Sequence, residues 1–332
     1  MSVSIFIQTL NEEDNLPGLL ESVAWADDIV VLDSLSTDRT KEICLQAGAR
    51  WYERAFDGRG THQTWAMENI EFKHQWVFYL DADERMTPKL RQEIEAIASK
   101  WEDGTYTREN GNPVAHYAGR KNIFRGQWLR FAMPPGNIMR FFQPPHIRFE
   151  RDANPIPIID GNIGYLKEHF IHYNFSKGIR EWIERHNRYS SYEAKETVLA
   201  LGASPIKLSN LFSNDRNTRR LELKNISFRM PMRPTLKFLY MYVLGLGFLD
   251  GRAGWTYCRL QAMYEYMIVL KVRELVRPEL AEQDRGDAKG PIPSASVDSS
   301  TTNQRTNQAP DQAREHAAET TANASQTPTG PS

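Results

Sequence analysis

The sequence has little of what disulfide-stabilised and exported proteins need. Its 332 residues include two cysteines, Cys44 and Cys258, which lie far apart and form no CxxC pair. This usage fits a reducing cytosol, and we expect two buried, chemically idle thiols. Residues 1–7 lack both a basic leader and a long apolar run, so we expect a first core strand there and not a signal peptide.

The glycine-rich phosphate loops of two nucleotide-binding classes are also missing. No GxGxxG motif follows the first predicted strand, which argues against a dinucleotide oxidoreductase. Residues 8–18 show no glycine-rich loop with a basic residue, which a nucleotidyltransferase would normally carry. A nucleotidyltransferase therefore stays only as a minor alternative.

A strong charge of one sign is absent as well. The 41 basic and 42 acidic residues give a net charge of −1, so no global field attracts nucleic acid. With 40% hydrophobic and 25% charged residues, the composition is that of an ordinary globular protein with a sizeable core. Large apolar side chains nearly vanish from about residue 281 onward, and we expect residues 281–332 to be a disordered tail.

Strand and helix patterns alternate through the first hundred residues, which predicts an α/β fold with a mostly parallel sheet flanked by helices. Ligands of such sheets bind beyond the carboxyl ends of the strands. The middle, about residues 110–175, is less regular. Short β-branched or aromatic runs predict strands at 3–10, 29–32, 51–54 and 76–80, and helical spacing predicts helices at 15–25, 37–47, 62–70, 88–101 and 176–200.

The segment Asp81-Ala82-Asp83-Glu84 directly follows the apolar run at 76–80. Cleavage of a bond to a nucleoside diphosphate leaves negative charge on the leaving group, and a hard divalent cation held by one or two carboxylates stabilises that charge. An isolated DxD triplet is more often an exposed loop start. Its place after a buried strand, in register with two other polar strand ends, favours a catalytic metal site in which Asp83 holds the cation and Asp81 contacts either the cation or the ribose.

Two further polar segments follow the first two predicted strands. In Thr9-Leu10-Asn11-Glu12-Glu13, Asn11 can cap the next helix, while Thr9 and Glu12 can face the base and ribose of a nucleotide. In residues 31–40, Asp33 ends a buried strand and can accept a hydrogen bond from a base N–H or a ribose hydroxyl. The nucleotide-binding candidates are therefore Thr9, Asn11, Glu12, Asp33 and Asp81.

In this order and spacing, the three segments resemble glycosyltransferase family 2, whose members have the GT-A fold. The family pattern TxNEE reads TLNEE at residues 9–13, VxDSxSTDxT reads VLDSLSTDRT at 31–40, and the acidic motif reads DADE at 81–84. Family members usually have glycine where this chain has Leu35. The resemblance covers about residues 3–275 and is closest to the bacterial branch with lipopolysaccharide-core glucosyltransferases and other envelope-polysaccharide enzymes.

The resemblance implies an inverting, hexosyl-type transfer from a nucleotide-diphosphate sugar, with a UDP-sugar favoured, to a glycan or lipid-linked acceptor, with Mg²⁺ or Mn²⁺. Inversion needs a general base near the acceptor hydroxyl. Many relatives carry a His-Glu pair for this where this chain has Asn154-Pro155, which leaves Glu150 and Asp152 as catalytic candidates. Surface ion pairing of both acids, or a nucleotide-sugar-binding protein that has lost catalysis, stays open.

His172 matches a histidine that follows the core domain in relatives. The resemblance implies that His172 contacts the metal or the donor phosphates, with a structural histidine as the equal alternative. Several basic residues are candidates for phosphate or acceptor contacts, and aromatic residues near Trp128 can shape an acceptor pocket. These basic residues are Arg54, Arg59, Arg120, Lys121, Arg125 and Arg130, each with a solvated surface charge as the alternative.

Two apolar runs at 236–249 and 261–272 are short for a bilayer span, which needs roughly 20 apolar residues. Their basic flanks leave two interpretations open: a helical hairpin on an anionic membrane surface, or helices packed on the globular domain. We expect a protein at the cytoplasmic face of the inner membrane. Its expected parts are a donor half at 1–110, an acceptor-side region at 111–200, a helical region at 201–280 and the tail at 281–332.

Overall fold

The computed structural model describes residues 3–106, 111–151, 155–203, 208–216, 218, 219, 222, 223, 226 and 232–277. All of them belong to one compact unit, Met1–Ala281. The predicted tail at 281–332 lies outside the described residues.

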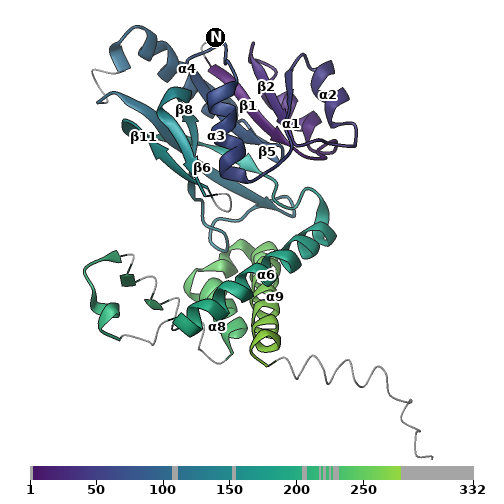
Figure 1. Cartoon of the computed structure of the whole chain (residues 1–332), viewed down its shortest axis with the longest axis vertical. Helices are drawn as coiled ribbons and strands as arrows, with labels where there is room; N and C mark the ends of the chain where they lie inside the picture. The colour runs from purple at the N-terminus through teal and green to yellow at the C-terminus, as the bar shows by residue number, and fades with distance from the viewer. Residues whose placement is uncertain are drawn as a thin grey trace, which may run out of the picture. The chain divides into compact units, whose positions relative to one another are not determined.

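Strands and helices alternate in the donor half, which confirms the predicted α/β order (Figure 1). The strands end before polar loops, and α4 begins at a proline whose preceding residue, Thr87, accepts a hydrogen bond from the Leu90 amide. The order is β1 (Val3–Thr9), α1 (Leu16–Val23), β2 (Ile29–Asp33), α2 (Thr40–Gln46), β3 (Arg50–Glu53), α3 (Arg59–Asn69), β4 (Trp76–Asp81), β5 (Glu84–Arg85) and α4 (Pro88–Glu102).

The middle of the chain is more regular than its composition indicated. Residues 113–172 contain β6 (Pro113–Phe124), β7 (Gln127–Trp128), β8 (Asn137–Phe142), β9 (Ile147–Glu150), β10 (Ile156–Ile159) and β11 (Asn162–His172). The prediction that residues 110–175 are less regular was wrong. These strands pair with partners distant in sequence, and such pairing outweighs local composition.

The main sheet has the order β3-β2-β1-β4-β8-β6-β11-β5, with β7 paired to β6. Strands β1 to β4 are parallel, and β8 is antiparallel to both β4 and β6. Strand β6 therefore points the same way as β4, and β11 is parallel to β6. The carboxyl ends of β1, β2, β4, β6 and β11 consequently lie at one edge of the sheet.

Alternate side chains of the strands pack into two apolar layers on opposite faces of the sheet. Val3, Ile5 and Ile7 pack with apolar residues of α1, α2 and α4 on one face, whereas Phe6 packs with residues of α3 on the other. Cys44 and Cys258 are free and buried, as predicted. Burial raises the pKa of the Cys44 thiol to about 12 and that of Cys258 to about 11, so neither thiol is reactive.

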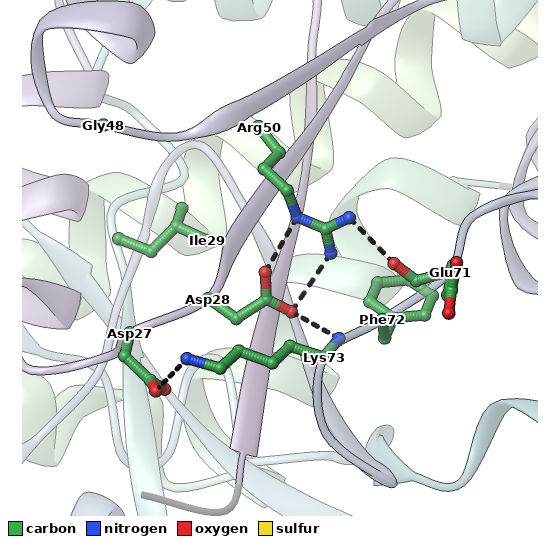
Figure 2. Close-up of a pocket in the computed structure, with 8 residues that line it drawn as sticks. All are labelled: Asp27, Asp28, Ile29, Gly48, Arg50, Glu71, Phe72 and Lys73. Carbon is green, nitrogen blue, oxygen red and sulfur yellow. Dashed lines mark hydrogen bonds and ion pairs between the residues drawn. The ribbon is translucent and has the colours of Figure 1, made fainter.

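A buried carboxylate, Asp28, ties together the amino ends of the parallel strands. Its oxygens accept hydrogen bonds from Ser4 Oγ, from Arg50 Nε at 2.9 Å and from the Lys73 amide at 2.9 Å. Figure 2 shows Arg50 spanning from this carboxylate to the carbonyl of Glu71. These residues line a pocket at the edge of the sheet opposite the polar strand ends, so we interpret it as structural.

We predict that Asp28→Asn lowers the free energy of unfolding at pH 7 by about 1–3 kcal/mol, because donors of a buried network lose their charged acceptor. Burial raises the pKa of Asp28, but the hydrogen bonds from Ser4, Arg50 and Lys73 outweigh it, so the net pKa is lowered. A lowered folded-state pKa contributes stability above the unfolded value, about 3.9, and this contribution disappears as the pH falls through the folded value.

Urea unfolding at pH 7 and pH 3 measures this effect, and the difference between wild type and Asp28→Asn should shrink at pH 3. The half-exposed neighbour Asp27 serves as the control, since Asp27→Asn removes surface pairs worth less than about 1 kcal/mol. A loss no larger than that of the control would contradict the network role.

The helical region consists of α6 (Gly178–Ala203), a 3₁₀ turn (Leu208–Phe212), α8 (Arg233–Leu239), a π-turn (Tyr240–Leu244), a 3₁₀ turn (Gly247–Asp250) and α9 (Gly251–Val276). Lys271 Nζ of α9 donates to Ser190 Oγ at 2.7 Å and Ser191 Oγ at 2.8 Å of α6. Gly254 permits a close approach, since a Cβ there would lie 2.1 Å from the Gly247 carbonyl oxygen. No helix in the described part of the chain is long and apolar enough to cross a bilayer.

Asp250 joins this helical region to the loop after β7. Its buried carboxylate accepts the backbone amides of Arg130 at 3.0 Å, Phe131 at 2.9 Å and Ala132 at 2.8 Å. Beside it, Phe124, Leu129 and Ala132 pack with apolar residues of α8 and α9 in a third apolar cluster. Part of the apolar region thus packs on the globular domain, as one of the two interpretations held.

Candidate active site

The polar residues predicted at the strand ends do meet at one edge of the sheet. Thr9 and Asp33 are paired across β1 and β2, and Gln8 is paired with Asp81 across β1 and β4. Strands β6 and β11 add Asn122 and His172, which are paired with each other. The site therefore combines the first hundred residues with two strands from the middle of the chain.

Asp33 organises the loop that follows β2. Thr9 Oγ1 donates to Asp33 Oδ1 at 2.6 Å, Ser36 Oγ donates to the same oxygen at 2.5 Å, and the Ser36 amide donates to Oδ2 at 2.6 Å. A carboxylate oxygen accepts about two hydrogen bonds. Oδ1 is thus fully used, whereas Oδ2 keeps one position for a ligand donor.

Leu35, at the tip of this loop, has a left-handed backbone with φ of +66°. This conformation costs an L-residue roughly 1–2 kcal/mol, whereas glycine adopts it freely. The loop geometry thus supplies a physical reason for glycine at this place in the motif, and this chain keeps the geometry with a strained leucine.

We predict that Leu35→Gly raises the free energy of unfolding by about 0.5–1 kcal/mol, since relief of strain exceeds the extra entropy of the unfolded chain. The Leu35 side chain is half exposed, so its removal loses little packing. Thermal or urea unfolding measures the change. Leu45→Gly, at an equally exposed position inside α2, should instead destabilise by about 1 kcal/mol. Destabilisation by both substitutions would contradict the strain.

The segment after β1 is held by hydrogen bonds to neighbouring loops. Asn11 Oδ1 accepts the Thr37 amide at 2.8 Å, so Asn11 connects two loops and does not cap α1, which begins at Leu16. Lys177 Nζ donates to Glu12 Oε1 at 2.8 Å and to the Asn11 carbonyl at 2.8 Å. Burial raises the pKa of Glu12 more than the hydrogen bonds from Lys177 and other donors lower it.

Asp81 lies against two arginines. Its Oδ2 accepts from Arg140 Nη2 at 2.7 Å and from Arg59 Nη2 at 3.0 Å, and the Tyr79 hydroxyl donates to Oδ1. Burial raises the pKa of Asp81, but the two guanidinium groups outweigh burial and hold it well below its usual range. Asp81 is therefore ionised, and its charge is already compensated within the protein.

Arg140 also binds Glu84, which is fully buried. Its Nη2 lies 2.8 Å from Glu84 Oε1, and Glu84 Oε2 accepts the Asp81 amide at 2.9 Å. Burial raises the pKa of Glu84 despite the opposing charge of Arg140. One guanidinium thus holds both ends of the acidic motif, and the loop between them turns Asp83 toward β11.

Asp83 faces His172 across the edge of the sheet, with Asp83 Oδ2 3.2 Å from His172 Nε2. The other ring nitrogen, Nδ1, lies 2.9 Å from Asn122 Oδ1. With a proton on Nδ1 the imidazole donates to this amide oxygen and Nε2 presents a lone pair to the carboxylate, and the tautomer decides which nitrogen carries that proton. Two electron-pair donors at this distance suit a shared proton or a shared cation.

The pair of Asp83 and His172 fits part of a metal site. Among the described residues, no set of three or more His, Cys, Asp and Glu side chains is arranged to hold a metal. Mg²⁺ commonly uses one or two carboxylates with water and substrate phosphates, and imidazole suits Mn²⁺. The pair thus fits a cation that takes its other ligands from a diphosphate and water. The structure places Asp81, the third predicted ligand, with Arg59 and Arg140.

Arg120 of β6 faces the same acidic residues. Its Nε is buried and has no hydrogen-bond partner. Burial lowers the pKa of Arg120, and the nearby carboxylates of Glu84, Asp81 and Asp83 oppose this effect. Arg120 thus places a positive charge near Asp83, where it favours an anionic ligand at this edge of the sheet.

Of the two predicted general bases, the structure describes only Glu150, which ends β9. Glu150 is exposed and only 3.9 Å from Arg148, whereas Asp152 and Asn154 lie outside the described residues. The β9–β10 hairpin packs on α3, since Thr64 Oγ1 exchanges hydrogen bonds with the Phe149 backbone. A Cβ at Gly60 would lie 2.3 Å from the Arg151 carbonyl, which places the hairpin tip beside the start of α3, where Arg59 reaches Asp81.

Sequence reasoning missed three residues of this edge. Arg140 was detectable, because a lone arginine in the apolar strand Asn137–Phe142 needs a buried partner. Asn122 and Lys177 gave no signal, because their roles depend on which strand and loop lie beside them.

Comparisons with known proteins show which family the sequence matches. The family model described as Glycosyl transferase family 2 matches residues 4–173. A glycosyltransferase of Rickettsia typhi is 24% identical over 284 residues, covering 82% of this chain and 87% of the relative. The lipopolysaccharide core biosynthesis glycosyltransferase LpsC of Rhizobium meliloti is 24% identical over 273 residues, covering 80% and 92%.

Solved structures resemble the chain more distantly. The crystal structure of S. aureus TarS 1–349 in complex with UDP-GlcNAc has a TM-score of 0.40 and 13% identity, covering 86% of this chain and 92% of that one. Glucosyl-3-phosphoglycerate synthase from Mycobacterium tuberculosis, in complex with Mn²⁺, UDP and phosphoglyceric acid, has a TM-score of 0.34 and 15% identity, covering 52% and 71%.

Proposed function

We propose, since this chain belongs to glycosyl transferase family 2, that it transfers a hexose from a UDP-sugar to a glycan or lipid-linked acceptor in envelope polysaccharide or lipopolysaccharide synthesis. The observation that carries the proposal is the placing of Asp83 and His172 beside the Thr9–Asp33 pair at one edge of the sheet. The name of the relative LpsC supports the lipopolysaccharide assignment.

In this proposal, each strand end has a separate task. The free lone pair of Asp33 Oδ2 accepts a donor from the base or ribose, and Glu12, held by Lys177, lies near Asp83. Asp83 and His172 would hold Mg²⁺ or Mn²⁺, which supplies compensation for the charge of the diphosphate leaving group. Arg120 adds positive charge beside Asp83 and so favours binding of the diphosphate.

Asp81 acts on the donor indirectly. Its charge holds Arg59 and Arg140 in place, and Arg140 in turn sets the loop that carries Asp83. The acceptor proton passes in this proposal to Glu150, which lies beside α3, or to Asp152, which is outside the described residues, and this transfer completes an inverting displacement.

We predict that Asp83→Ala lowers sugar transfer or donor hydrolysis at least about 100-fold, because leaving-group charge loses its compensation. The measurement is UDP release from a panel of UDP-sugars with Mn²⁺, alongside calorimetric titration of UDP with and without Mn²⁺. Asp14→Ala, at an exposed position directly after the TLNEE segment, is the control and should keep full activity.

Full activity of Asp83→Ala, or of the wild type with chelator, would contradict the metal role. Donor binding without turnover over a broad acceptor panel would instead favour a nucleotide-sugar-binding protein.

We also propose that the face around α8 and the turns before α9 rests on an anionic membrane surface. Several of its large apolar side chains are exposed, among them Tyr240, Leu244 and Leu249. Exposed Arg252 and Arg259 lie on the adjoining helix α9. Apolar insertion combined with basic charge is typical of helices that lie in the membrane interface.

We predict that Leu244→Glu weakens binding to vesicles of phosphatidylglycerol and phosphatidylethanolamine about 10-fold, since one buried leucine contributes about 1.5–3 kcal/mol. Co-sedimentation of the full chain measures this binding. Leu199→Glu is the matched control, because Leu199 of α6 is 72% exposed and Leu244 is 75% exposed. Equal binding of both variants, or equal binding of wild type to phosphatidylcholine vesicles, would contradict the proposal.

A further inference from the structure

The short hairpin of β6 and β7 carries an unusual concentration of positive charge next to the proposed site. Lys121, Arg125 and Arg130 lie within ten residues on and beside this hairpin, whereas the chain as a whole has a net charge of −1. None of the three forms an ion pair with a carboxylate among the described residues. Their charge is thus available to a ligand.

Two of these cations contact the same aromatic ring. Lys121 Nζ lies 4.7 Å and Arg130 Cζ lies 4.4 Å from the centroid of the Trp128 ring. Each contact is worth about 0.5–1 kcal/mol at an exposed site, so the ring orders two side chains that would otherwise be mobile. Trp128, Lys121 and Arg130 together form what we call the cationic clamp.

The backbone that carries the clamp is rigid. The hairpin turn has two residues with positive φ, Arg125 at 52° and Gly126 at 73°, which matches the twist of the flanking strands. The Leu129 amide donates to the Asn122 carbonyl at 3.0 Å. Asp250 holds the amides that follow, including that of Arg130. A preorganised clamp loses little entropy when it binds a ligand.

The hairpin that carries the clamp lies at the same edge of the sheet as the reacting centre. It follows the carboxyl end of β6, where Asn122 contacts His172 and His172 faces Asp83. The donor nucleoside, in the proposed function, occupies the ends of β1 and β2 on the other side of β4. The acceptor must approach Asp83 from a side that the donor does not fill, and the hairpin lies on such a side.

From this arrangement, and resting on the proposed glycosyl transfer, we infer that the acceptor is an anionic glycan whose phosphate group is bound by Lys121 and Arg130 at the Trp128 ring. Arg130 can bind a phosphate through two N–H groups, and Lys121 adds a point charge. The clamp positions the acceptor through its charged group and leaves the neutral hydroxyl to the reacting centre.

The test uses the full chain saturated with UDP and Mn²⁺, so that the donor site is occupied. The protein carries 5-fluorotryptophan, and the Trp128 resonance is assigned with Trp128→Phe. Inorganic phosphate, glucose 1-phosphate, glucose 6-phosphate and glucose are titrated separately. We expect the phosphates to shift the Trp128 resonance and glucose to leave it unchanged.

The double variant Lys121→Gln/Arg130→Gln should weaken binding of the sugar phosphates about 10-fold or more, because it removes two charge-assisted contacts. Lys89→Gln/Lys195→Gln removes the same net charge from exposed positions elsewhere and should have no effect. UDP affinity, measured separately by calorimetry, should stay the same in both variants.

Three results would overturn the inference: no binding by any phosphate, equal binding by glucose, or a loss confined to UDP affinity, which would assign the clamp to the donor. Loss of vesicle binding without loss of sugar phosphate binding would overturn it too, since the clamp would then face the membrane. Failure of wild-type protein to bind UDP would instead contradict the proposed function, which keeps the two claims distinguishable.

Discussion

The geometry of the candidate site depends on one buried guanidinium. Arg140 joins Asp81 at the end of β4 to Glu84 at the start of β5, and it comes from β8, the strand inserted against β4. Two buried carboxylates this close would repel each other without a shared cation. Because Arg140 compensates both, the short loop between them holds a single shape, and Asp83 faces His172 rather than solvent.

The secondary structure of the first hundred residues could be predicted because it follows from local sequence patterns. Apolar runs and helical spacing predicted the strands and helices from β1 to α4 except the two-residue strand β5, and the parallel arrangement placed Thr9, Asp33 and Asp81 at one edge. The side-chain contacts at this edge of the sheet could not be predicted from the sequence. Asp81 and Asp83 are two residues apart in one motif, yet one lies against arginines and the other against a histidine.

The middle of the chain resisted prediction for a different reason. Strand β6 pairs with β8 and β11, and β8 pairs with β4, across long stretches of sequence, so the formation of these strands depends on tertiary contacts. The same pairing supplies Asn122 and His172, which no local pattern connects with Asp83. The catalytic roles of Glu150 and Asp152 stay predictions. Glu150 lies near α3, whereas Asp152 lies outside the described residues.

The three amides that end on Asp250 have a mechanical consequence. Three consecutive N–H groups fix both the position and the orientation of the Asp250 carboxylate. The turn before α9 and the loop after β7 therefore move together as one rigid unit. If the helical region rests on a surface, the height of Arg130 above that surface is constant. The site would then reach only acceptor hydroxyl groups at one distance from the membrane. Chemically identical hydroxyl groups nearer to the membrane or farther from it would not react.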